Sequence, residues 1–123
     1  MEGSHTNIQQ RTEDFAVRVV KAYSELNNRR FDDPAKVLAK QFLRSGTSIG
    51  ANCAEAVYAQ SNNDLISKYS ISLKEASETR YWIKLMIKSD LVSEQRFSMM
   101  QQEIVAIIKI LTVIINKLKS KSK

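Results

Sequence analysis

The sequence predicts an all-α protein that folds as an antiparallel up-down four-helix bundle. The chain of 123 residues contains only 3 glycines and 1 proline, too few for the frequent turns of a strand-rich domain. Apolar residues recur at helical spacing over four long segments, and the polar stretches between them are short. The length suits one domain over residues 1–123, whose ends, residues 1–7 and 119–123, are expected to be loose.

The first two helices are predicted from their spacing and their boundaries. Over residues 8–27, apolar side chains fall on one face at intervals of three, four and seven residues. The polar run NNRR that starts at Asn27 then interrupts the pattern. The second helix is predicted from Pro34 to about residue 59, because Asp33 is a good N-cap and proline is favoured at the first helical position.

The last two helices begin at recognisable caps. Ser61 and Asp64 resemble a capping box, with Asp in place of the usual Glu, and predict a helix from there to about Lys88. Ser93 is the predicted N-cap of the fourth helix, which is expected to reach about Lys119.

The fourth helix is apolar over more than one face. A heptad-like seam predicts its packing against the bundle, and further isoleucine and valine side chains widen the seam beyond what a monomer needs. The seam consists of Met100, Ile104, Ile107, Leu111, Ile114 and Leu118. The excess predicts a second copy or another partner on this helix. The apolar stretch 104–115 contains Lys109 and is shorter than the roughly 20 residues of a membrane span, so no membrane association is expected.

The stretch SGTSIGANCAEA, residues 45–56, concentrates small side chains within the second helix. Glycine costs about 1 kcal/mol relative to alanine inside a helix, so Gly46 and Gly50 need a structural reason. Two glycines four residues apart make a close-packing notch on one helix face, where a neighbouring backbone can approach. A continuous helix is favoured because the periodicity runs through the stretch, and a kink at Gly46 is the alternative.

Several polar residues are predicted to meet where the second and third helices face each other. Glu55 lies beside the small residues, and the third helix carries two carboxylates near an arginine. Because buried charges need partners, these residues are expected to form one polar cluster within the bundle or between subunits. Its members are Asn52, Glu55, Glu75, Glu78 and Arg80. The alternative is that Glu75 and Glu78 are ordinary exposed residues of a charged helix.

The charge balance favours an acidic partner. Lys and Arg number 19 against 13 Asp and Glu, for a formal net charge of +6. Such an excess raises the odds of binding RNA, DNA or another anionic surface. The candidate phosphate contacts are Arg29, Arg30, Lys36, Lys40, Lys117, Lys119, Lys121 and Lys123. No base-reading module is visible, so recognition by charge and shape is expected.

No residue pattern in the sequence indicates a catalytic site. The single histidine, His5, stands in the N-terminal segment, and the Glu-x-x-His pairs of a di-iron bundle do not occur. The carboxylates of the predicted cluster could hold a hard cation, but an ion-pair network with Arg80 is the preferred interpretation. Cys53 has no histidine to act as its base and is expected to be a packed thiol. We expect no enzyme and no cofactor, and a single cysteine fits a reducing cytoplasm.

Two blocks of sequence resemble a known family. SIGANCAEA (48–56) and the segment 59–92, which contains LKEASETRYW, look like the bacterial four-helix-bundle proteins encoded in intervening sequences of 23S rRNA genes, often labelled 23S ribosomal proteins. The lead-in LAKQFLRSG adds to a match that covers most of the chain. The accessory proteins of diversity-generating retroelements are similar in fold.

The resemblance implies an antiparallel four-helix bundle and, as in the related accessory proteins, a homopentamer. It also implies nucleic-acid binding through a basic surface and no established catalytic activity. The family blocks map here onto Asn52, Glu55, Glu75, Glu78, Arg80, Tyr81 and Trp82.

Two hypotheses for function follow. In the first, an oligomer of this chain binds rRNA or another structured nucleic acid by charge. In the second, the chain is a protein-interaction scaffold without nucleic-acid affinity. Salt discriminates between them, because binding through phosphates weakens steeply as salt rises.

Overall fold

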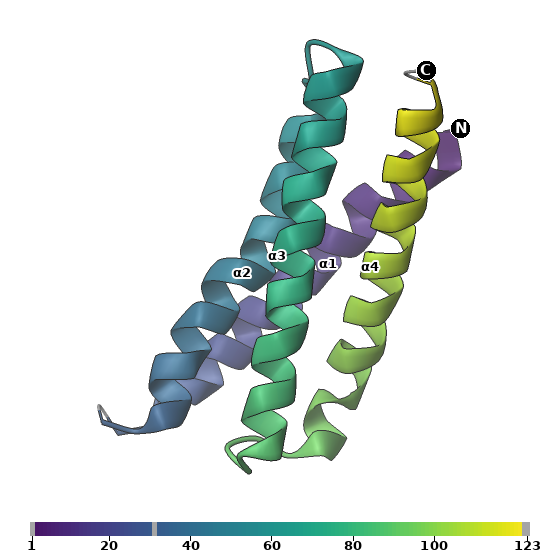
Figure 1. The fold of residues 1–123 in the computed structure, drawn as a ribbon. Coiled ribbons are helices and arrows are strands. Elements are labelled where there is room, and N and C mark those ends of the chain that lie inside the picture. The colour runs from purple at the N-terminus through teal and green to yellow at the C-terminus, as the bar shows by residue number, and fades with distance from the viewer. Residues whose placement is uncertain (1, 31, 122–123) are drawn as a thin grey trace.

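Four helices follow one another along the chain in the computed structural model (Figure 1). They are α1 (Glu2–Leu26), α2 (Pro34–Ala56), α3 (Asn62–Lys88) and α4 (Glu94–Lys121). Residues 2–30 and 32–121 are described, with side chains from residue 7 onward. Each helix contacts the next one along the chain, and α4 returns to α1. The predicted all-α, up-down four-helix bundle is therefore confirmed.

Three helices begin at the caps that the sequence predicts. The Asp33 carboxylate accepts a hydrogen bond from the Ala35 N–H at 2.9 Å at the start of α2. The Ser61 hydroxyl accepts from the Asp64 N–H at 3.0 Å at the start of α3, and Ser93 caps α4 in the same way. Each cap satisfies an N–H group that has no partner inside its own helix, so these boundaries are fixed locally.

The terminal helices extend into the segments 1–7 and 119–123 that the sequence predicts to be loose. α1 already begins at Glu2, and α4 continues to Lys121. Among the described side chains, Ile8 and Leu118 are the buried ones nearest the two ends. The expectation of loose ends stays a prediction, because helical backbone does not exclude it.

The heptad-like seam of α4 forms a large part of the core. All six residues predicted for the seam, from Met100 to Leu118, are buried. They belong to one apolar cluster with buried side chains of the other three helices. The rings of Phe42 and Phe97 lie 6.0 Å apart and join α2 to the first turn of α4. Burial of this apolar surface is the main stabilising contribution to the fold.

By length and composition alone, α4 would also be long and apolar enough to cross a membrane. It has 28 residues and contains an 18-residue window of mean hydropathy 1.6, whereas the sequence-based expectation was a stretch too short to span. The core helix of a bundle meets the same criterion, and 33% of that window is buried inside the protein. The composition of α4 is therefore weak support for a membrane role.

The glycines of α2 face α1, and α2 is one continuous helix through both of them. A β-carbon at Gly46 would lie 2.8 Å from Val19 Cγ2, and one at Gly50 would lie 3.1 Å from the carbonyl oxygen of Thr12. Both distances are shorter than ordinary van der Waals contacts, so a β-carbon at either position would require atoms of α1 to shift. The predicted close-packing notch is confirmed, and the alternative of a kink at Gly46 is wrong.

We predict that Gly50→Leu lowers the free energy of unfolding by about 1–3 kcal/mol, because the new side chain must displace the α1 backbone at Thr12. Ala51→Leu is the matched control, since Ala51 is the exposed neighbour in the same helix. It should change stability by less than about 0.5 kcal/mol. Urea unfolding followed by circular dichroism measures both, and equal midpoints for the two variants would contradict the close approach.

Candidate functional site

The interface between α2 and α3 contains buried hydroxyl groups. The Thr79 hydroxyl donates to Ser45 Oγ at 2.9 Å, and the Ser72 hydroxyl donates to the carbonyl oxygen of Ile49 at 2.9 Å. All three hydroxyl-bearing residues are fully buried. Small polar side chains let the two helix backbones come close while every buried hydroxyl keeps a partner. The interface therefore has a fixed register along both helices.

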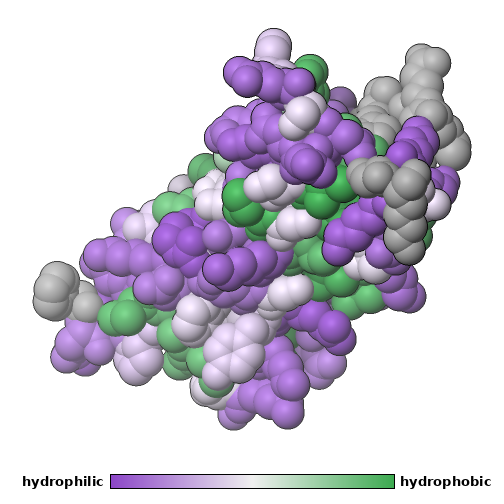
Figure 2. All heavy atoms as spheres, turned by 45° about the horizontal axis from the view of Figure 1, so that its top comes forward, coloured by the Kyte–Doolittle hydropathy of each residue, from purple (hydrophilic) through white to green (hydrophobic). Residues whose placement is uncertain are grey.

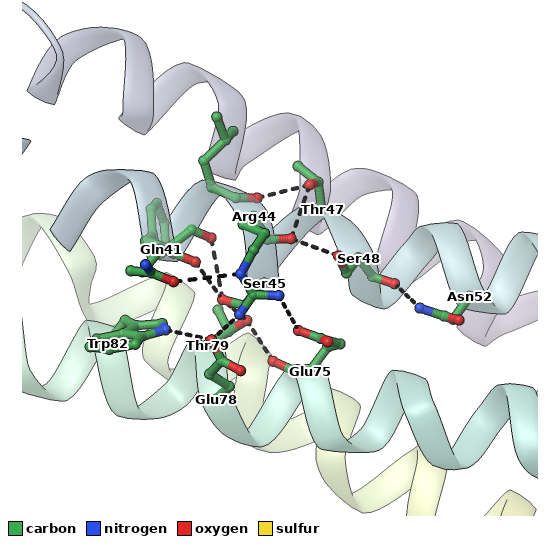
Figure 3. Close-up of polar contacts among 12 residues, drawn as sticks. Gln41, Arg44, Ser45, Thr47, Ser48, Asn52, Glu75, Glu78, Thr79 and Trp82 are labelled. Atoms are coloured by element: carbon green, nitrogen blue, oxygen red, sulfur yellow. Dashed lines mark hydrogen bonds and ion pairs between the residues drawn. The ribbon is translucent and has the colours of Figure 1, made fainter. Parts of the chain in front are cut away.

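Arg44 of α2 lies at the outer edge of this interface, between two carboxylates of α3. Its guanidinium contacts Glu75 Oε1 at 3.2 Å and also forms an ion pair with Glu78. On the other side, the indole N–H of Trp82 donates to Glu78 Oε2 at 3.0 Å. Figure 3 shows this arrangement, with Arg44 reaching across from its own helix to the α3 side chains. We call Arg44, Glu75, Glu78 and Trp82 the Arg44 network.

The Arg44 network changes the acidity of Glu78. Hydrogen bonding from Trp82, together with the Arg44 guanidinium, lowers the pKa of the Glu78 carboxyl below its ordinary value, and nearby Lys74 acts in the same direction. Glu78 therefore stays ionised to a lower pH than an ordinary glutamate. The arrangement is a satisfied ion-pair network.

The predicted polar cluster is only partly correct. Glu75 and Glu78 lie together, but their cation is Arg44 and not Arg80, which is exposed. Arg80 follows Glu78 by two positions, and residues two apart on a helix do not face each other. The basic partner therefore has to come from the neighbouring helix.

Asn52 and Glu55 also lie outside this network. The Asn52 amide donates to the Ser48 carbonyl oxygen at 2.8 Å, within its own helix. The Glu55 carboxylate is exposed and forms an ion pair with Lys68 at 2.8 Å. The prediction of a single cluster is wrong, because Asn52 bonds within α2 and Glu55 pairs with Lys68 of α3.

Cys53 is buried and contacts the Ser72 hydroxyl at 3.3 Å. Burial raises the pKa of its thiol above the ordinary value. A nucleophilic cysteine needs the opposite shift, so the site has the character of the packed thiol that the sequence predicts. Within the residues described, no three His, Cys, Asp or Glu side chains come together in a way that could hold a metal ion.

The predicted phosphate contacts divide into two groups. Four of them lie around the connection between α1 and α2, namely Arg29, Arg30, Lys36 and Lys40. Three lie at the C-terminal end of α4, namely Lys117, Lys119 and Lys121. Lys123 is outside the described residues. Figure 1 shows that the α1–α2 connection and the end of α4 are at opposite ends of the bundle, so the two groups do not form one surface.

A third basic surface, which the sequence reasoning missed, runs along the outside of α3. Four exposed cations make up this α3 cationic face, namely Lys74, Arg80, Lys84 and Lys88. The ion pairs found among the described residues use other cations. Figure 2 shows that the exposed surface on this side of the molecule is mostly hydrophilic. The signal was available in the sequence, because no acidic residue occurs between Glu78 and Asp90.

We predict that the fluorescence of Trp82, the one tryptophan, changes as Glu78 takes up a proton, with a midpoint below pH 4.5. The pKa of Glu78 is lowered in the folded protein. The network therefore stabilises the fold above the ordinary glutamate pKa and loses that contribution as the pH falls through the folded value.

Glu78→Gln is the control for this titration, because its amide keeps the shape and has no proton to gain. The variant should be less stable than the unchanged protein at pH 7, and the difference should shrink on acidification. Circular dichroism at each pH reports whether the helices persist. A titration that is unaltered in Glu78→Gln would contradict the assignment.

Comparison with known proteins places this geometry in a family. Residues 4–113 match the family described as 23S rRNA-intervening sequence protein. A crystal structure of a protein of unknown function from the S23 ribosomal protein family of Bacteroides thetaiotaomicron VPI-5482 is 40% identical and superposes with a TM-score of 0.84. That match covers 92% of this chain and 98% of the other.

No curated protein matches the chain. The similarity in fold to retroelement accessory proteins stays a prediction. The family resemblance inferred from SIGANCAEA and LKEASETRYW is confirmed by the match over residues 4–113, and the chain belongs to the 23S rRNA-intervening sequence protein family.

Proposed function

We propose that this chain is a non-enzymatic, oligomeric helical-bundle protein that binds nucleic acid by charge and shape. The α3 cationic face carries the proposal. It offers four exposed cations on one helix, and the helix has no acidic residue after Glu78 to neutralise them. From Lys74 to Lys88 the rise of the helix is about 21 Å, long enough for a row of several phosphates. The rRNA suggested by the family name is one candidate target.

A purely structural explanation covers only part of this face. Lysines in the last turn of a helix complement its dipole, which accounts for Lys88. Lys74 and Arg80 lie near the middle of α3, where the dipole gives no such advantage. Glu75 and Glu78 are close by, but both are engaged by Arg44. Lys74 lies near enough to Glu78 to lower its pKa, but no ion pair found among the described residues uses Lys74, Arg80, Lys84 or Lys88, which leaves this face available to an external anion.

The double variant Lys84→Glu/Lys88→Glu tests the proposal by fluorescence anisotropy with labelled structured RNA across a salt series. We expect weaker binding and a shallower dependence of log K on log salt, because fewer counterions are released. Lys117→Glu/Lys119→Glu is the matched control, with the same change in net charge at the end of α4. If the control loses as much affinity as the α3 variant, the binding surface is elsewhere or diffuse.

Self-association is the second part of the proposal, and exposed apolar residues support it. Met99 and Val113 of α4 are 61% and 49% exposed, and they lie two heptads apart on one side of the helix. Val113 also lines a groove of about 240 Å³ together with Ile110 and with Asn7 of α1. The expected pentamer would multiply weak phosphate contacts around a ring. Cytoplasmic localisation remains part of this proposal.

Multi-angle light scattering tests the association. We expect Met99→Glu/Val113→Glu to convert a multimer into a monomer without loss of helix, because both positions are exposed in the single chain. Val37→Glu is the control, since Val37 is 59% exposed on α2. An identical mass for all three proteins would remove this surface of α4 from the interface.

A protein-interaction scaffold is the second candidate function, favoured by the same exposed apolar side chains. A scaffold uses the outside of α1 and α4 for another protein and shows no nucleic-acid affinity even at low salt. The salt series therefore separates the two functions directly.

A further inference from the structure

Tyr81 is a large aromatic side chain in the middle of the α3 cationic face. Its side of the helix is open, and the residue is 55% exposed. Lys74, Ser77, Lys84 and Lys88 are spaced from it by seven, four, three and seven positions, and all of them are exposed. Residues at these spacings share one side of an α-helix. Tyr81 therefore stands in a row of lysines.

The Tyr81 ring is also supported by a contact with Trp82. Its ring makes an edge-on contact with the ring of Trp82, with the centroids 5.3 Å apart and the planes at 66°. Trp82 is in turn anchored by its hydrogen bond to Glu78, which is an ion-pair partner of Arg44. Because Trp82 supports the Tyr81 ring and is linked through Glu78 to α2, the ring loses little conformational freedom when a ligand binds.

We propose that Tyr81 stacks with an unpaired base of single-stranded nucleic acid while the flanking lysines hold its phosphates. This inference rests on the proposed function and names its ligand. Stacking on an aromatic ring is available to every base, so it needs no sequence readout. In a duplex the base faces are already stacked on one another, so the site selects single strands, loops and bulges.

The alternative role for Tyr81 is to cover Trp82, and the choice of variant separates the two. Tyr81→Leu keeps an apolar cover over Trp82 but removes the ring that a base would stack on. Tyr81→Phe keeps the ring. Tyr58→Leu is the matched control, because Tyr58 is the most exposed of the large apolar side chains, at 84%, and lies just after α2, away from the α3 cationic face.

The experiment measures anisotropy of a labelled RNA of about 12 nucleotides, a length within the range of single-stranded sites. It uses the strand alone and in a duplex with its complement. We expect Tyr81→Leu to bind the single strand about 5- to 30-fold more weakly. Tyr81→Phe and Tyr58→Leu should stay within about twofold of the unchanged protein. The duplex should bind more weakly and respond little to Tyr81→Leu.

Two further readouts are specific to stacking. The slope of log K against log salt should be the same for Tyr81→Leu and the unchanged protein, because no phosphate contact is lost. Addition of the single strand should also quench Trp82, whose ring touches Tyr81. A purely structural effect of Tyr81→Leu would lower the urea midpoint and weaken strand and duplex alike.

The outcomes separate this inference from the proposed function. If the unchanged protein binds neither RNA at low salt, the proposed function fails and the inference fails with it. If it binds and Tyr81→Leu binds the strand equally well, nucleic-acid binding stands and stacking on Tyr81 is wrong. Equal losses for strand and duplex, or a changed subunit number in Tyr81→Leu, would also overturn the inference.

Discussion

The close approach of α2 to both of its neighbours is the constraint on which the rest of the bundle depends. Toward α1, a β-carbon at Gly46 or Gly50 would require atoms of α1 to shift. Toward α3, the small hydroxyl groups of Ser45 and Ser72 bridge the two backbones. Since short helix–helix distances require small residues on facing surfaces, α2 cannot slide or rotate without creating clashes or unpaired hydroxyl groups. This fixed register brings Arg44 opposite its two glutamates.

The Arg44 network connects that packing to the outer surface of α3. A single guanidinium engages both nearby carboxylates, and through Glu78 it fixes the indole of Trp82. Glu75 and Glu78, which would otherwise repel a phosphate near this part of α3, are thereby paired with Arg44 of α2. The opposite side of the helix is left with lysines, an arginine and an exposed tyrosine. Packing inside the bundle and charge on its outside are thus two results of one arrangement.

The sequence predicted what is determined within single helices. Caps at Asp33 and Ser61, the seam of α4 and the glycine notch are patterns of a few neighbouring residues, and each is present in the structure. Contacts between helices were harder to predict. The partner of Glu78 is 34 positions away, at Arg44. Arg80, the arginine nearest to Glu78 in sequence, was the wrong choice, because residues two positions apart on a helix point to different sides.

The candidate phosphate contacts do not form one surface. Their positions in the sequence did not indicate which end of the bundle each of them occupies.

Ionic strength affects the α2–α3 interface and the α1–α4 interface differently. Beside its ion pairs, the α2–α3 side has buried hydroxyl contacts that ions do not reach, whereas the polar links between α1 and α4 are the ion pairs Arg11–Glu103 and Arg96–Glu25. Ions screen such exposed pairs over a distance of about 8 Å at 0.15 M ionic strength. Salt that weakens binding of the protein to a polyanion therefore also weakens the ion pairs between α1 and α4. The α2–α3 edge keeps its buried hydroxyl contacts at any ionic strength, whereas the polar links of the α1–α4 edge are ion pairs and weaken as ionic strength rises.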